Sequence, residues 1–142
     1  MSISDHIYLN LIDLNALPAI LAYRDYFSNR DNKFYRISSN DLQPYEYPEE
    51  IQDFIRKLYQ ANIIQPFNWV AWRESDEGQQ LMSYPSRIKE APIEEVIKLL
   101  IAHLRSDRFI AGHLATVIEE GQINLILERF EELIGKQNLT LA

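Results

Sequence analysis

A regular spacing of apolar residues, clearest from Pro92 to Leu104 in PIEEVIKLLIAHL, determines which fold class this chain can adopt. The apolar residues that recur there three and four positions apart are Ile93, Val96, Ile97, Leu100, Ile101 and Leu104. This spacing places them on one side of an α-helix, and an ion pair between Glu94 and Lys98 would support the helix. Similar spacing recurs along most of the chain, whereas the alternation typical of strands is nearly absent. The sequence therefore predicts an all-α fold.

Proline, asparagine and glycine divide this pattern into about five or six helices. The expected helices cover residues 14–27, 48–62, 67–83, 92–107, 112–120 and 122–134. Pro48 and Pro92 suit the first position of a helix, and Asn62 can end one in a left-handed conformation. Gly121 would cap the fifth helix, so that the last two helices form a C-terminal helical hairpin. We expect one compact bundle, a single α-helical domain of residues 1–142.

The segment FYRISSNDLQPYEYPEE interrupts the helical pattern, which is weakest from Lys33 to Asp41. Its prolines and turn-forming residues predict an irregular connection or a short extended segment. Tyr45 and Tyr47 lie there among acidic residues and prolines, and two interpretations stay open. Either their rings cover the core from a solvated loop, or they form a binding site for a partner protein.

Composition and charge exclude several classes of function. The chain has no cysteine, which rules out disulfides, zinc–thiolate sites, iron–sulfur clusters and thiol nucleophiles. Its net charge of −7 disfavours nucleic acid and anionic membranes as partners. No apolar run reaches the roughly 18 residues of a membrane span, and the first residues lack the features of a signal peptide. We therefore expect a soluble cytoplasmic protein.

Motifs that would indicate catalysis or a bound cofactor are also missing. The three histidines do not have the spacing of a helical metal site, and no glycine-rich phosphate loop or serine-nucleophile motif occurs. The sequence predicts no metal, no cofactor and no identifiable catalytic residue, although it does not decide whether the chain is an enzyme. His103 and Asp107 are four positions apart, which predicts a surface hydrogen bond between them.

The block RSDRFIAGHL, from Arg105 to Leu114, allows two interpretations. As a structural clamp, its arginines would bind carbonyl groups at the end of the core helix, Asp107 would cap the next helix, and Phe109 would fill the corner. As a site, Arg105 and Arg108 would hold a phosphate or carboxylate. His113 would then act as acid or base, with Asp107 or Glu120 orienting it.

Trp69 and Trp72 are three positions apart and would lie near one another on a helix. They would either anchor the core or a partner interface, or line a ligand pocket.

The segments NWVAWRES and HLRSDRFIAGHLATVIEEGQINLILERFEEL resemble an uncharacterised, mainly prokaryotic family, the domain of unknown function DUF6508. The resemblance covers about residues 66–134, with LAYRDYFSNRDNKFY as a further candidate segment. The matching positions are Trp69, Trp72, Arg105, Asp107, Arg108, Phe109, Gly112, Leu114, Gly121, Ile123, Leu127 and Arg129. The resemblance implies an established fold unit but no activity, substrate or catalytic residue.

Two functions are compatible with these observations. The preferred hypothesis is a small accessory or protein-interaction module that binds a protein partner or another copy of itself. The alternative is a protein or enzyme that binds a small anion, phosphate or carboxylate, at the corner formed by Arg105, Arg108 and His113.

Overall fold

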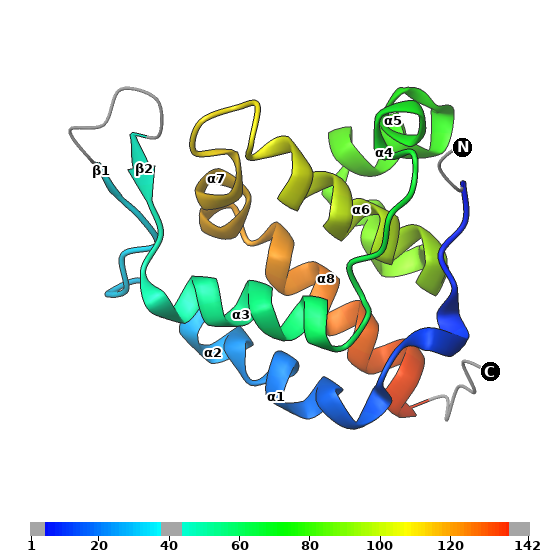
Figure 1. Cartoon of the computed structure of the whole chain (residues 1–142), viewed down its shortest axis with the longest axis horizontal. Helices are drawn as coiled ribbons and strands as arrows, with labels where there is room; N and C mark the ends of the chain where they lie inside the picture. The colour runs from blue at the N-terminus through cyan, green and yellow to red at the C-terminus, as the bar shows by residue number, and fades with distance from the viewer. Residues whose placement is uncertain (1–4, 38–43, 137–142) are drawn as a thin grey trace.

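The computed structural model describes residues 5–37 and 44–136, with side chains through residue 134. Within these residues the chain forms eight α-helices and one two-stranded sheet, and the all-α prediction is confirmed (Figure 1). The helices are α1 Leu17–Leu21, α2 Tyr23–Ser28, α3 Glu49–Gln60, α4 Trp69–Glu74, α5 Asp76–Ser83, α6 Ile93–Ser106, α7 His113–Glu119 and α8 Gln122–Phe130. Short 3₁₀ turns span Leu9–Leu11, Leu14–Ala16 and Pro85–Glu90, and a π-helical turn spans Glu131–Lys136.

The local signals for helix ends act where the sequence predicts. Pro48 and Pro92 directly precede α3 and α6, and Asn62 has a left-handed backbone with φ 61°. Gly121, with φ 82°, ends α7 as expected, and α7 and α8 pack against each other. Glu94 and Lys98 form the expected ion pair, with 3.8 Å between Oε1 and Nζ.

The chain has more helices than expected because two predicted helices are divided. The first becomes a 3₁₀ turn followed by α1 and α2, which meet at Ala22. The third breaks at Ser75, whose extended backbone ends α4 and whose Oγ accepts a hydrogen bond from the amide of Gly78 in α5. A Cβ atom at Gly78 would lie 1.9 Å from the carbonyl oxygen of Trp72. Glycine is therefore what lets α5 fold back against the end of α4.

The interrupted region contains a short antiparallel pair of strands, β1 Arg36–Ile37 and β2 Tyr45–Glu46. Arg36 pairs with Glu46 and Ile37 with Tyr45. The prediction of a short extended segment is therefore confirmed for these residues. The part of the weak stretch from residue 38 to 41 lies outside the described residues.

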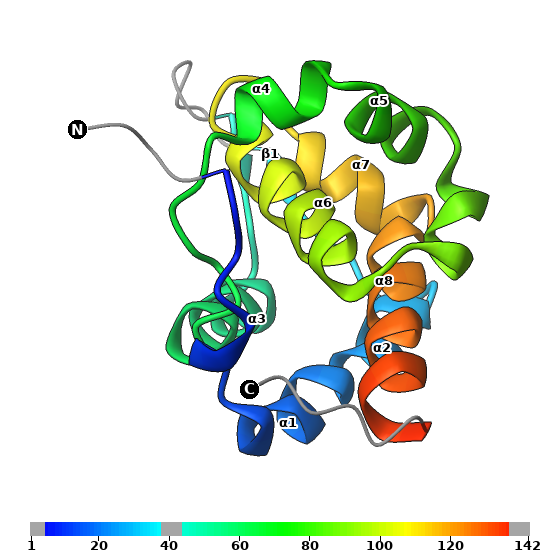
Figure 2. The ribbon, with the colours of Figure 1, turned by 90° about the vertical axis from the view of Figure 1, so that its right-hand side faces the viewer.

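Helix α6 forms the centre of the core. Apolar side chains from every part of the described chain join in one buried cluster, and α6 contributes more of them than any other helix. It packs against α4 and α5 on one side and against α7 and α8 on the other (Figure 2). The last turn of α6 is buried as well, at Leu104 and Ser106, so the turn that follows it starts from a fixed position. None of the helices in the described part of the chain is both long and apolar enough to cross a membrane.

Candidate functional site

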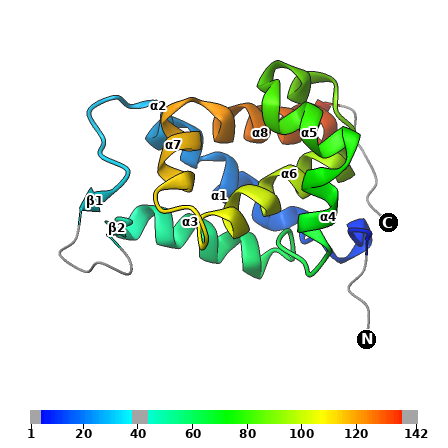
Figure 3. The same cartoon turned by 90° about the horizontal axis from the view of Figure 1, so that it is seen from above.

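The block from Arg105 to Leu114 forms the last turn of α6 and a tight connection to α7, which we call the α6–α7 corner. The amides of Phe109 and Ile110 both donate to the carbonyl oxygen of Ser106, which continues the chain in a closed turn. Gly112 follows with φ 77°, a conformation that favours glycine. In Figure 3 this connection lies beside β2, and a Cβ atom at Gly112 would lie 2.6 Å from the ring of Tyr45.

Asp107 holds the corner together from inside. One oxygen of its carboxylate accepts hydrogen bonds from the backbone amide of Leu114, at 2.9 Å, and from the hydroxyl of Tyr47, at 2.6 Å. The first bond satisfies an amide in the first turn of α7, which is the capping role expected for Asp107. Burial and the bond to Asp107 raise the pKa of the Tyr47 hydroxyl well above its ordinary value. Tyr47 therefore acts as a neutral donor.

Tyr45 and Tyr47, for which the sequence left open a core-covering or a partner-binding role, are both engaged within the chain. The ring of Tyr45 packs 4.9 Å from that of Tyr35 and lies over Gly112, and the hydroxyl of Tyr47 is bonded to Asp107. Both side chains are half-buried. They attach the β2–α3 connection to the corner.

His103 and His113 form a direct pair behind the corner, with 3.0 Å between Nδ1 of His103 and Nε2 of His113. His103 is only 1% exposed, so the predicted surface hydrogen bond to Asp107 is wrong. Burial, followed by His113 and Arg73, lowers the pKa of His103 to about 3. Burial also lowers the pKa of His113, although Asp107 acts in the opposite direction. Both imidazoles are therefore neutral near pH 7, and Nε2 of His103 has no hydrogen-bond partner in the described structure.

The residues predicted to hold an anion make separate contacts. The guanidinium of Arg105 lies 5.9 Å from the ring centre of Tyr59, at the end of α3. Arg108 is exposed and forms no ion pair with any described residue. Arg108 and Asp107 line a small pocket of about 110 Å³, and neither Arg105 nor His113 lines it. Glu120 lines a different pocket, of about 400 Å³, at the turn between α7 and α8.

The corner presents an exposed aromatic surface. Phe109 is 77% exposed, so the expectation that it fills the corner is wrong. Its ring lies 6.0 Å from that of Trp69, which is half-buried at the start of α4. Val70 and Ile110, their neighbours in the chain, are exposed as well. We define the corner face as Arg105, Arg108 and Phe109 of the α6–α7 corner together with Tyr59 and Trp69, the aromatic residues that Arg105 and Phe109 contact.

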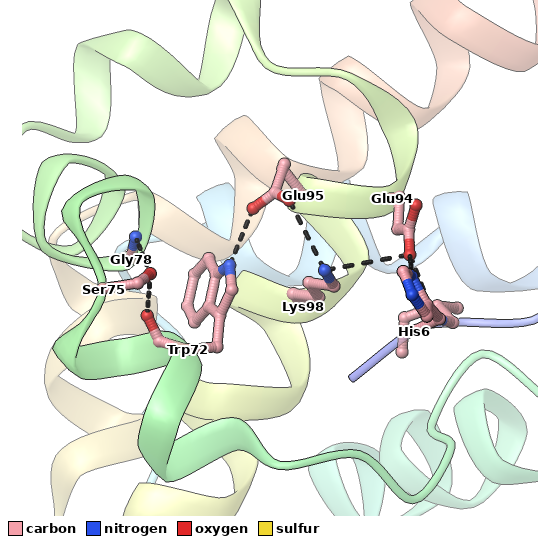
Figure 4. A network of polar contacts seen from close by, with 8 residues as sticks. His6, Trp72, Ser75, Gly78, Glu94, Glu95 and Lys98 are labelled. Atoms are coloured by element: carbon pink, nitrogen blue, oxygen red, sulfur yellow. Dashed lines mark hydrogen bonds and ion pairs between the residues drawn. The ribbon is translucent and has the colours of Figure 1, made fainter. Parts of the chain in front are cut away.

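Trp72 is in the core, unlike Trp69, and belongs to a polar network (Figure 4). Its indole Nε1 donates to Glu95 at 2.7 Å, and Nζ of the buried Lys98 lies 3.5 Å from Glu95. Lys98 also reaches Glu94, which accepts a hydrogen bond from the backbone amide of Ile7 at 3.1 Å. The network thus connects α4, α6 and the first described segment of the chain. The sequence analysis predicted the pair of Glu94 and Lys98 from its spacing, and the contacts with Trp72 and Ile7 depend on tertiary packing.

The network also perturbs a carboxyl group on its outer side. The neighbouring Glu95 raises the pKa of the exposed Glu77, although Lys98 acts in the opposite direction. The arrangement resembles a structural ion-pair network more than a catalytic pair, because Lys98 is buried between its two carboxylates and none of these three residues lines the pockets of about 890 and 400 Å³.

A pocket of about 890 Å³ lies beside the β1–β2 pair and away from the candidate site residues, apart from Tyr47. Its described lining is Asn32, Lys33, Phe34, Tyr35, Arg36, Ile37, Glu46, Tyr47, Pro48 and Glu119. Sequence reasoning missed this pocket because it depends on how a loop without helical periodicity folds. The described residues contain no group of three or more histidine and carboxylate side chains that could hold a metal ion.

A comparison with protein families gives one match. The family described as "Family of unknown function (DUF6508)" matches residues 12–136 of this chain. The match includes the predicted 66–134 segment and extends from it through α3 to the turn before α1. No curated protein and no solved structure matches the chain.

Proposed function

This chain belongs to DUF6508, a family of unknown function, and from its own surface we propose that it is a small single-domain accessory protein that binds another protein through the corner face. The observation that carries this proposal is the exposure of Phe109, at 77%, beside Trp69. An aromatic side chain left in water gives up the stabilisation that burial would provide, about 1.5–3 kcal/mol. Contact with a partner would recover it.

The composition of the corner face supports a protein as the ligand. Tryptophan, tyrosine, phenylalanine and arginine are enriched at protein interfaces, and a few such residues supply most of the binding energy. All five residues of the corner face carry large aromatic or guanidinium groups that are at least partly accessible. The face therefore has the chemistry of an interface hot spot.

The backbone that carries the face is rigidly supported. Asp107 ties the corner to Tyr47 and to α7, and Ser106, whose carbonyl closes the turn, is fully buried. A preorganised surface loses little conformational entropy on binding, which favours affinity. The corner thus combines exposed anchor residues with a fixed scaffold.

The small-anion alternative has less support. It requires Arg105, Arg108 and His113 to converge on one ligand, but Arg105 contacts Tyr59, His113 contacts His103, and neither lines the pocket beside Arg108. His113 is directed to His103 and is kept neutral by burial. The geometry therefore favours a protein partner.

The proposal is tested by affinity capture with the full chain from a lysate of its source organism, followed by quantitative mass spectrometry. Wild type is compared with Phe109→Ser and with Tyr84→Ser, a control that changes another exposed aromatic residue, at the end of α5. We expect specific proteins to be recovered equally by wild type and the control. Their recovery with Phe109→Ser should reflect an affinity about 30-fold weaker, as for loss of a hot-spot residue. Equal recovery by all three chains would contradict the proposal.

A further inference from the structure

The electrostatics of the corner face differ from those of the chain as a whole. The chain carries a net charge of −7, yet Arg105 and Arg108 both lie on this face. The acidic residue between them, Asp107, has its carboxylate engaged by Tyr47 and Leu114. A third guanidinium, that of Arg73 in α4, lies 3.4 Å from the hydroxyl of Ser106 beside the corner. The corner is thus a local positive region on an acidic protein.

Arg108 is the exposed cation of this region. It makes no ion pair with the residues that the structure describes. Its guanidinium can therefore bind a partner's carboxylate without breaking an existing ion pair. Next to it in the chain, Phe109 projects into solvent beside Trp69. A ligand that satisfies both features needs an apolar group for the two rings and a carboxylate for the guanidinium.

We propose that the corner face binds a short acidic segment of a partner protein, which places an aliphatic or aromatic side chain against Trp69 and Phe109 and a carboxylate at Arg108. This inference rests on the proposed function and specifies the chemistry of the partner. Arginine recognises carboxylates through paired hydrogen bonds, and an adjacent apolar contact excludes water and strengthens them. Arg105, stacked on Tyr59, provides a second position for a carboxylate.

Charge argues against a second copy of the chain as the occupant of this face. In a symmetric dimer the same patch meets itself, so Arg105 and Arg108 would face their equivalents across the interface. Like charges at close range oppose such pairing, and two chains of −7 repel each other as well. An acidic segment avoids the first penalty, because its carboxylates lie opposite the arginines of the corner face.

Charge also favours an acidic peptide over nucleic acid, although aromatic and arginine side chains can bind bases as well. At physiological salt, charges act over about 8 Å. A few carboxylates fit within that distance of the corner arginines. A nucleic acid strand carries a phosphate at every nucleotide and would extend from the corner over the acidic remainder of the surface.

The test is selection of a random 16-residue peptide library, displayed on phage, on the immobilised full chain. We expect the selected peptides to combine Asp or Glu with a nearby Leu, Ile, Phe or Trp. A synthetic copy of the best peptide should bind Phe109→Ser and Arg108→Glu at least tenfold more weakly than wild type. Arg87→Glu, which makes the same charge change at an exposed arginine between α5 and α6, should bind within twofold of wild type.

The outcomes separate this inference from the proposed function. Peptides that require Phe109 but show no acidic preference, and that bind Arg108→Glu as well as wild type, would overturn the acidic chemistry and leave the interaction role intact. Selection of no peptide that depends on Phe109 would count against both. Binding of a 20-nucleotide oligo(dT) that is lost in Phe109→Ser would assign the face to nucleic acid. A dimer by sedimentation that becomes a monomer in Phe109→Ser would assign it to a second copy.

Discussion

His103 is an imidazole that the fold keeps neutral. Its pKa is about 3 in the folded chain, because of burial, His113 and Arg73, against an ordinary value of 6.5. Between these pH values the unfolded chain binds a proton that the folded chain does not. Protonation of His103 in the unfolded chain therefore costs no stability well above pH 6.5. As the pH falls from 6.5 toward 3, it lowers the free energy of unfolding by up to about 1.4 kcal/mol per pH unit.

The measurement is urea unfolding of wild type and His103→Gln at pH 7.5 and pH 5, with the native helical content of each checked by circular dichroism. The variant should lose less stability than wild type between the two pH values, because it has one fewer group that protonates on unfolding. An equal loss in the two proteins would show that His103 does not carry this dependence.

Asp107 and Arg108 are adjacent but should differ sharply in their contribution to stability. Replacing Asp107 by alanine removes two hydrogen bonds to a charged group and leaves the amide of Leu114 and the hydroxyl of Tyr47 without that partner. We expect a loss of about 2–3 kcal/mol in the free energy of unfolding. Arg108→Ala removes an exposed side chain and should change it by less than about 0.5 kcal/mol. Urea denaturation of both variants measures the difference, and a large loss in Arg108→Ala would mean that the arginine is a clamp.

Gly78, inside α5, and Gly121, in the turn between α7 and α8, have opposite surroundings, which makes them an informative pair of substitutions. Alanine in place of glycine in an open helix stabilises it by about 1 kcal/mol. At Gly78, however, the new Cβ would lie 1.9 Å from the backbone oxygen of Trp72, so α4 and α5 must separate. We expect Gly78→Ala to cost about 3 kcal/mol. At Gly121 no atom lies within 4 Å of the new Cβ, and only the left-handed backbone opposes alanine, by about 1–2 kcal/mol.

Thermal or urea unfolding ranks the two glycine variants. Gly78→Ala should be the less stable by at least about 1 kcal/mol, the difference between backbone overlap and left-handed strain. A Gly78→Ala protein as stable as wild type would mean that the close approach of α5 to α4 is not required.

Helix boundaries were predictable where one residue decides them and not where packing does. Pro48 and Pro92 restrict the backbone and Gly121 permits a left-handed one, so the starts of α3 and α6 and the boundary between α7 and α8 follow from the sequence. The break at Ser75 depends on α5 folding back beside Trp72, which helical periodicity does not reveal. Its local signal was a serine followed by two acidic residues, a common start of a helix.

The candidate site was predictable in position but not in orientation. The sequence identified the block from Arg105 to Leu114, and the capping role of Asp107 follows from its place before α7. The sequence did not show that Phe109 is exposed while His103 is buried. Both outcomes depend on which side chains α4 and α7 cover in the folded chain. Chemical type indicated which residues to consider, and tertiary packing decided which of their side chains are exposed.

The net charge of −7 should make the whole fold sensitive to salt. Folding brings the excess negative charges closer together, and their repulsion reaches about 30 Å at 10 mM salt but only about 8 Å at 150 mM. Raising sodium chloride from 10 to 150 mM should therefore increase the free energy of unfolding by about 1 kcal/mol. Binding of an acidic peptide at the corner should weaken over the same range, because there salt screens an attraction.

A single charge change tests whether repulsion is the cause. Glu90→Lys alters an exposed residue before α6 and brings the net charge from −7 to −5. Because repulsive energy grows with the square of the charge, the gain from salt should fall to about half of that in wild type. Urea unfolding of both proteins at the two salt concentrations gives the two gains. Equal gains would mean that salt acts through local ion pairs or apolar burial rather than through the excess negative charge.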